Sequence, residues 1–436
     1  MGARRADSAL KDWIAAHGIA EVECLLADQN GVARGKIISA ADFVGHARTQ
    51  SLRLASSALS ITITGDYAAY KGDAILDPDL RLEPDPQSLA VLPGFEGTRA
   101  GVFCEPLTQA GEPWPSAPRN VLKALIRLYA GIGLRPVIAP EIEFYLLGEE
   151  GARPAPYGLE AMARRGSFFA AVERASAAAG IELAGALAEC GPGQLEINLR
   201  HGDPVRRADQ AVLFKRIVRH AARELGLAAT FMAKPMGREA SSGMHFHLSL
   251  VRAKGEANAF ADARGADTDA LRWFIGGLQA FLPEIAPLYA PHPNSYRRMR
   301  PRYSAPVTLA WGRDNRSCGL RIPLSDPANR RVEVRAPGAD ANPYLAMAAA
   351  LAAGWLGMER RLEPGPEVKD AIAYGQKPEF PRTLDEGLAR LATCQPICEL
   401  LGDPFIGVFL AVKNAELHSF SDVITPWERE HLLDQV

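Results

Sequence analysis

The chain has 436 residues, of which 47% are hydrophobic and 23% charged, and its formal net charge is −2. This composition is that of an ordinary globular protein, long enough for two or three domains or for one large catalytic domain with a smaller partner. The nearly balanced charge gives no electrostatic basis for binding nucleic acid or an anionic membrane, so we expect neither partner.

The cysteines and the apolar stretches indicate a cytoplasmic protein. Of six cysteines, only Cys394 and Cys398 lie close together, which is a poor zinc signal and favours reduced thiols. No long apolar run follows the basic residues near the N-terminus, so we expect no secretory signal. The most apolar segment, residues 344–358, is shorter than the roughly 20 residues needed to span a bilayer and predicts a buried helix.

The first hundred residues predict a small sheet. Alternating apolar residues and an Asn30-Gly31 turn are typical of a hairpin. The expected strands are residues 22–28, 35–39, 60–64, 89–92 and 100–103.

A stretch rich in Pro, Gly and Ser, residues 106–118, predicts the boundary between two domains. After it, residues 120–129 have helical periodicity with Asn120 as the expected N-cap, and residues 208–225 predict a second long helix. We therefore expect an α+β protein with a small N-terminal domain over residues 1–112 and a catalytic domain over residues 113–436.

Several predicted strands of the second domain place ionisable side chains at every second position, where they share one face. The residues between them are apolar. A Glu-x-Glu pair is usually a solvated face, His-x-His is a somewhat better metal signal, and surface arginines form ion pairs of little value. The recurrence of one pattern in four strands favours a charged cleft that metal ions and anionic ligands would neutralise. These stretches contain Glu141 and Glu143, Glu196, His245 and His247, and Arg331, Glu333 and Arg335.

Taken in order, these and further segments resemble the glutamine synthetase family over nearly the whole chain. The opening segment, residues 28–36, resembles the small N-terminal domain of that family. The other matching segments are Pro140-Glu-Ile-Glu-Phe144, Gly193-Gln-Leu-Glu196, Lys234-Pro235, Ser242-Gly-Met-His-Phe-His247, Asn294-Ser-Tyr-Arg-Arg298, Ala305-Pro306, Asn315-Arg-Ser317, Leu320-Arg-Ile-Pro323, Arg331-Val-Glu-Val-Arg335 and Ala341-Asn-Pro-Tyr344.

The resemblance implies a β-grasp-like N-terminal domain and a curved antiparallel sheet that forms the active-site cleft. It also implies ATP as a substrate and two or more Mg²⁺ or Mn²⁺ ions. The first metal site would comprise Glu143, Glu189 and Glu196, and the second Glu141, His245 and Glu333. Carboxylates suit a hard cation, and an imidazole makes Mn²⁺ acceptable.

The same resemblance assigns the substrate-binding residues. Arg298, Arg321 and Arg335 would grip the carboxylates of glutamate, a task suited to a forked guanidinium group. The nucleotide would be bound by His247, Ser249, Arg316 and Arg331, of which the two arginines hold its phosphates and act in catalysis.

The implied reaction has two steps. The γ-carboxylate of glutamate attacks the γ-phosphorus of ATP, and an amine then displaces phosphate from the γ-glutamyl phosphate to form an amide. Asp66 is the candidate base for the amine, acting across an interface between subunits arranged in hexameric rings, commonly a dodecamer.

The amine is expected to be larger than ammonium. True glutamine synthetases carry a glutamate directly before the Ala-Pro pair, where this chain has Ser304. The spacing from Glu189 to Glu196 and the segment 424–429 resemble the γ-glutamylpolyamine synthetase branch, which uses putrescine or a related amine.

Other functions remain open from the sequence. They are glutamine synthesis from ammonium, ligation to ethanolamine or another small amine, and a non-catalytic regulatory role, which the complete set of ionisable residues disfavours. A guanidino kinase, whose cleft chemistry is related, is disfavoured by the N-terminal match.

Overall fold

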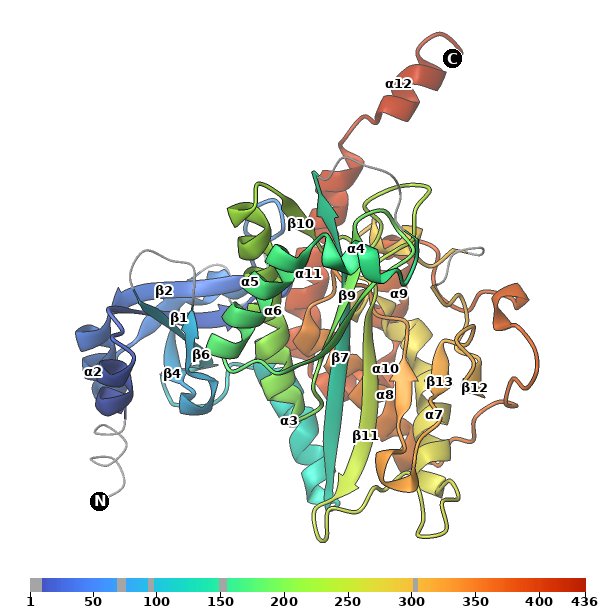
Figure 1. Ribbon diagram of the computed structural model, residues 1–436, viewed down its shortest axis with the longest axis horizontal. Coiled ribbons are helices and arrows are strands. Elements are labelled where there is room, and N and C mark those ends of the chain that lie inside the picture. Colours follow the sequence, from blue (N-terminus) through green and yellow to red (C-terminus); the bar gives the residue numbers. More distant parts are fainter. Residues whose placement is uncertain (1–9, 69–75, 93–97, 149–154, 301–304) are drawn as a thin grey trace.

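The computed structural model describes residues 10–68, 76–92, 98–148, 155–300 and 305–436. Two β-sheets organise these residues, a smaller one near the N-terminus and a larger one in the remaining chain (Figure 1). Helices cover the larger sheet, so the predicted α+β class is confirmed. The proposed division at residues 112 and 113 falls between the last strand of the small sheet and the first helix of the larger unit.

The small sheet has the strand order β2-β1-β6-β4-β3, with β5 paired to β6. Strands β1 and β2 form the expected antiparallel hairpin, and β1 pairs with β6 in parallel. Helix α2 packs on β1 and β2 and closes this part of the core. The elements are β1 (Glu21–Ala27), β2 (Ala33–Ser39), α2 (Ala40–Thr49), β3 (Arg53–Ala55), β4 (Asp79–Pro84), β5 (Ala90–Leu92) and β6 (Arg99–Leu107).

Two local predictions in this region are wrong. Residues 60–64 do not form a strand; Ile61 makes only an isolated bridge to Tyr67, and Gly65, at φ +95°, turns the chain between them. Asn120 is not an N-cap, because helix α3 (Pro118–Gly131) begins two residues earlier. The Asn120 side chain instead donates to the carbonyls of Pro106 and Trp114, which ties the helix to the preceding loop.

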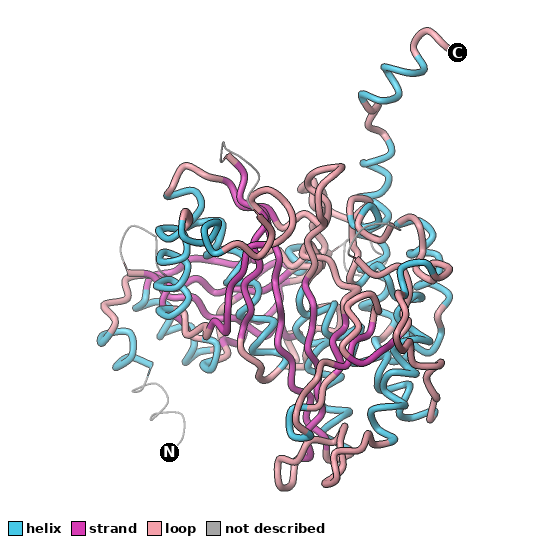
Figure 2. Tube along the Cα trace, turned by 45° about the vertical axis from the view of Figure 1, so that its right-hand side comes forward, coloured by secondary structure: helices cyan, strands magenta, loops and turns pink. Residues whose placement is uncertain are grey.

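The large sheet has the order β12-β13-β14-β11-β7-β9-β8, with β10 paired to β7. All its pairs are antiparallel except β12 with β13. The strands are β7 (Leu134–Leu147), β8 (Leu183–Ala188), β9 (Gln194–Leu199), β10 (Ala228–Thr230), β11 (Met244–Arg252), β12 (Trp311–Arg313), β13 (Leu320–Ile322) and β14 (Val332–Val334). Figure 2 shows these strands running together through the middle of the molecule.

The main core lies between the large sheet and its helices, with α8 (Pro343–Arg360) at its centre. This helix is the predicted apolar segment, and nearly all of it is buried. The other α-helices of the large unit, besides α3, are α4 (Leu159–Ala163), α5 (Gly166–Ala178), α6 (Pro204–Glu224), α7 (Asp269–Phe281), α9 (Leu384–Thr393), α10 (Gln395–Leu401), α11 (Asp403–Ser421) and α12 (Pro426–Leu432).

Asn342, the N-cap of α8, joins the two sheets. Its side-chain oxygen accepts from the Tyr344 amide, while its Nδ2 donates to the carbonyls of Asp28, at 2.9 Å, and Gln29, at 3.3 Å. One buried amide therefore caps the central helix of the large unit and binds the hairpin turn of the small one.

The C-terminal segment stands away from the body of the molecule (Figure 1). Helix α12 contains no buried residue. The apolar side chain of Trp427 in this helix is exposed, as are those of Ile424 and Leu433 on either side of it. Among the described residues, no single helix is long and apolar enough to cross a membrane; a bent pair, residues 395–401 with 403–432, reaches that threshold by length and composition only.

Helices α7 and α8 touch through two glycines. A Cβ on Gly357 would lie 2.2 Å from the Trp273 carbonyl oxygen and 2.5 Å from the Gly277 Cα. We predict that Gly357→Ala lowers the free energy of unfolding by about 1–3 kcal/mol, because the helices must separate. The control is Gly131→Ala at the end of α3, where a Cβ meets nothing within 4 Å. Urea unfolding midpoints measure both changes; equal midpoints for the two variants contradict this packing.

Candidate active site

The register of the large sheet brings the predicted ionisable residues onto one face. Glu141 lies opposite His245, Glu143 opposite Glu196, and His247 opposite Glu333. Side chains of directly opposite residues stand about 5 Å apart on the same side of a sheet. The apolar residues between them, such as Ile142, point into the core on the other side.

Three carboxylates form one cluster, and they are the set predicted for the first metal. One oxygen from each of Glu143, Glu189 and Glu196 lies within 4.8 Å of the others. Burial and the neighbouring carboxylates raise the pKa of Glu189 to about 7 and that of Glu196 to about 9. A divalent cation is the ligand that relieves this repulsion, and an all-oxygen donor set is suited to Mg²⁺ or Mn²⁺.

The loop before β9 sets the position of the first cluster. Gly193 has φ +77°, and a Cβ there would lie 2.4 Å from the Leu146 carbonyl oxygen, so the tight turn requires glycine. The next residue, Gln194, donates from Nε2 to Glu143, at 3.3 Å, and to the Ser241 carbonyl, at 3.0 Å. The Gly243 amide also donates to Glu143, at 2.8 Å.

The histidines lie beside this cluster, toward β14. Glu141 groups with His247 and Glu333, and separately with Glu196 and His245. In the predicted second set, His245 Nδ1 lies 3.8 Å from Glu141 Oε2 and 3.7 Å from Glu333 Oε1. His245 thus lies close to both carboxylates predicted to share a metal with it, and His247 Nε2, predicted to contact the nucleotide, lies 2.7 Å from Glu141 Oε1.

Opposing effects set the charge of the two carboxylates nearest the histidines. Burial acts to raise the pKa of Glu141, but hydrogen bonds with His245 and His247 outweigh burial and hold it far below the ordinary range. Burial likewise opposes ionisation of Glu333, yet the charge of Arg335 and both imidazoles lower its pKa to about 2. These two side chains are therefore ionised at neutral pH.

The three arginines predicted to bind glutamate are buried along the same cleft. Glu333 holds two of them, with Arg321 Nη1 at 2.7 Å from Oε2 and Arg335 Nη1 at 2.5 Å from Oε1. Arg298 donates to the carbonyls of Ala336 and Arg335, and its burial lowers its pKa to about 10. Their positions are thus fixed before any substrate binds.

Of the residues predicted to bind the nucleotide, all but Ser249 line the cleft. Arg316 and Arg331 line the cleft, and Arg331 Nε donates to His247 Nδ1 at 3.1 Å. Ser249 does not line it; its hydroxyl donates to the Arg330 carbonyl and accepts from Asn258. Asp66 is exposed in the N-terminal unit and is absent from the lining of this cleft.

The cleft, of about 850 Å³, is also lined by residues that sequence reasoning missed. Asn198 lies on β9 opposite Glu141, and its buried Oδ1 has no hydrogen-bond partner. Gln194, Glu196 and Asn198 alternate on β9, so the two-residue period could have identified both amides. Tyr157 comes from a turn and Tyr374 from a short 3-10 helix, Ala373–Gly375, with no comparable signal. Ser304, expected to influence the amine, lies outside the described residues.

Residues 115–432 match the family model for the glutamine synthetase catalytic domain, so the chain belongs to the glutamine synthetase family and is a ligase. The family predicted from the sequence is confirmed.

Two relatives and one solved structure define the similarity further. γ-Glutamylputrescine synthetase PuuA of Escherichia coli (strain K12) is 35% identical, covering 94% of this chain and 91% of that protein. Glutamate–isopropylamine ligase of a Pseudomonas species is 31% identical and covers 98% and 97%. A GmaS/ADP complex superimposes with a TM-score of 0.86 at 27% identity, covering 98% and 99%.

The raised carboxyl pKa values predict that metal binding depends on pH. Glu189 and Glu196 hold protons at pH 6.5 that a cation must displace, and their pKa values of about 7 and 9 leave fewer to displace at pH 8.5. Mn²⁺ affinity should therefore rise with pH, by up to about tenfold per unit for each proton displaced.

Calorimetry in two buffers of different ionisation enthalpy measures both the affinity and the protons released. The matched variant Glu196→Gln should weaken binding, flatten its pH dependence and release fewer protons. Equal affinity at both pH values, without proton release, is inconsistent with cation binding at this cluster.

Proposed function

We propose that this ligase joins the γ-carboxylate of L-glutamate to a primary amine of the polyamine type, with ATP as the phosphoryl donor. The observation that carries the proposal is the pairing, in one cleft, of a three-carboxylate cluster with arginines held at fixed positions. Such a cleft accommodates a nucleotide with its cations and a substrate that bears carboxylates. The similarity to PuuA and to the isopropylamine ligase supports an amine larger than ammonium.

The chemistry follows from the charges of the cleft. In the first step a γ-carboxylate oxygen forms a bond to the γ-phosphorus of ATP, and the bond from that phosphorus to ADP breaks. In the second step the amine nitrogen attacks the acyl carbon, and phosphate leaves with the electrons of the carbon–oxygen bond. Phosphate is a far better leaving group than hydroxide, which is why ATP is needed.

The residues divide these tasks. Glu143, Glu189 and Glu196 would hold one divalent cation, and Glu141, His245 and Glu333 a second. Bound there, Mg²⁺ or Mn²⁺ supplies positive charge that offsets the charge developing on the phosphate oxygens. Arg316 and Arg331 would contact the phosphates, with His247 beside Arg331, while the buried Arg298, Arg321 and Arg335 orient glutamate.

The amine must lose a proton, and we assign this step to Asp66 of a neighbouring copy. Asp66 lies on an exposed turn whose neighbours Ile63 and Tyr67 are 56% and 68% exposed. Because Asp66 does not line the cleft of its own chain, it can act only in a second one. This assignment requires a homo-oligomer, for which we propose the hexameric rings expected from the sequence.

The amine preference gives the first test. Phosphate release from ATP, glutamate and Mg²⁺ is measured in parallel with putrescine, spermidine, ethanolamine, methylamine and ammonium. We expect turnover with putrescine or spermidine and negligible turnover with ammonium. The variant Glu143→Gln keeps an acceptor for the Gly243 amide, and its rate of phosphate release should fall by on the order of a hundredfold or more. Strong turnover of the wild type with ammonium contradicts the proposal.

The role of Ser304 is tested in the same assay. We predict that Ser304→Glu shifts preference toward ammonium, because a carboxylate before Ala305 restores part of a compact cation site. Ser304→Gln is the matched control, of nearly the same size but without the charge. An unchanged amine profile in both variants means that other residues set the selectivity.

Assembly is tested by light scattering on a sizing column. We expect a large homo-oligomer, and we expect the exposed apolar residues of the C-terminal segment to contribute contacts between copies. Trp427→Lys should then reduce the size of the assembly, whereas Glu430→Lys on the same exposed helix should not. A fully active monomer excludes catalysis by Asp66 in a second copy.

A further inference from the structure

The turn that carries Asp66, residues 62–67, is closed by its own hydrogen bonds. The Thr62 amide donates to the Asp66 carbonyl at 2.8 Å, and the Asp66 amide donates to Thr62 Oγ1 at 2.9 Å. Thr64 Oγ1 donates to the Asp66 carboxylate at 2.8 Å. These contacts define the shape of the Asp66 turn but do not fix its position on the molecule.

Its position is fixed by Glu416, a buried residue of α11 that is 353 positions away in the sequence. Glu416 Oε1 accepts from the Ile63 amide at 2.7 Å and from Asn30 Nδ2 at 2.6 Å. The same carboxylate thus holds the Asp66 turn and the turn between β1 and β2.

Lys413, one helical turn earlier on α11, orients that carboxylate. Its Nζ lies 2.9 Å from Glu416 Oε2 and also donates to Asn30 Oδ1. Lys413 is 0% and Glu416 5% exposed. His292 Nδ1 approaches the same oxygen, Oε2, at 3.7 Å. Burying an ion pair costs desolvation energy, and the best-attested return for that cost is a uniquely defined geometry.

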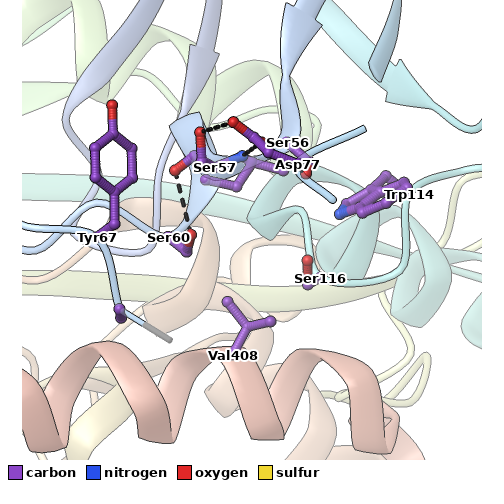
Figure 3. Close-up of a pocket in the computed structure, with 10 residues that line it drawn as sticks. Ser56, Ser57, Ser60, Tyr67, Asp77, Trp114, Ser116 and Val408 are labelled. Carbon is purple, nitrogen blue, oxygen red and sulfur yellow. Dashed lines mark hydrogen bonds between the residues drawn. The ribbon is translucent and has the colours of Figure 1, made fainter. Parts of the chain in front are cut away.

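A second contact lies at the other end of the Asp66 turn. Ala68, buried directly after it, packs against Val408 and Val412 of α11. In Figure 3 the side chain of Val408 rises from this helix toward the segment that contains Ser60 and Tyr67. Helix α11 therefore holds the exposed turn on both sides, by a polar contact at Ile63 and an apolar contact at Ala68.

We propose that Glu416, oriented by Lys413, is a positioning residue for the amine-activating step. It holds the Ile63 amide, and through it the Asp66 turn, at the place from which Asp66 reaches the cleft of a neighbouring copy. The inference rests on the proposed role of Asp66. Glu416 touches no substrate; it acts only through the turn.

The two half-reactions separate this role from general damage. Phosphoryl transfer to glutamate uses residues of the cleft alone, whereas amide formation also requires the base. When the amine step is slow, the α-amine of γ-glutamyl phosphate attacks its own acyl carbon. A carbon–nitrogen bond forms, phosphate leaves, and a proton passes to solvent, which gives 5-oxoproline. The ratio of amide to phosphate therefore reports the amine step.

The test compares two double variants. Lys413→Met with Glu416→Leu removes the ion pair together with the acceptor for the Ile63 amide. Lys413→Met with Glu416→Gln removes the ion pair but keeps a side-chain oxygen for that amide. Replacing both charges together avoids leaving one buried charge unpaired. We expect the Leu variant to lower amide formation by about tenfold or more, as Asp66→Asn does, and to raise the share of 5-oxoproline.

The KM values for ATP and glutamate should not change in the Leu variant, and the Gln variant should remain close to the wild type. The positioning role is overturned if Asp66→Asn lowers the ratio of amide to phosphate while the Leu variant keeps the wild-type ratio. An equal loss of both half-reactions in the Leu variant also overturns it. A wild-type ratio of amide to phosphate in Asp66→Asn itself means that the proposed base is wrong.

If the Leu variant does not assemble, hydrogen exchange of the wild-type peptide 61–67 decides. The Ile63 amide should exchange slowly, and exchange at the rate of a free chain overturns the inference.

Discussion

Repulsion among buried carboxylates is the constraint on which the rest of this structure depends. Glu143, Glu189 and Glu196 place three acids within one coordination sphere, and burial together with the neighbouring carboxylates raises the pKa values of the last two. Antiparallel pairing of β7 with β9 and β11 holds this arrangement against the repulsion. The core behind the sheet, centred on α8, supplies the free energy that makes that pairing rigid.

Two arginines of the cleft lie on or beside β13 and β14 of the same sheet, and their orientation is set differently. Each carboxylate oxygen of Glu333 accepts a hydrogen bond from one guanidinium group, so the protein orients Arg321 and Arg335 before a ligand binds. An anionic substrate entering the cleft meets donors that already point in defined directions. Little reorganisation is then required during the reaction, which is the main source of electrostatic catalysis.

The sequence predicted which side chains lie together where ionisable residues recur at every second position of a strand. Glu141 and Glu143, or His245 and His247, must share a face once their strands form, so their convergence could be predicted from spacing. Residues 60–64 are rich in β-branched side chains, which favour a strand, but they enter a turn, because Gly65 adopts a left-handed conformation and Glu416 accepts a hydrogen bond from the Ile63 amide. No local pattern reveals a contact across 353 positions. For the same reason the sequence did not indicate that Glu333 would hold two arginines expected to bind substrate.

The cap of α8 has a consequence for folding. Asn342 supplies the cap of the most buried helix while its Nδ2 binds the backbone of the hairpin turn at Asp28 and Gln29. Detaching the small sheet would leave that buried amide and the two carbonyls without these partners, at the start of the central helix. The division of the chain into two sheets is therefore not a division into two cooperative units. Unfolding of the small sheet should draw the central helix with it, and the two parts should melt in one transition.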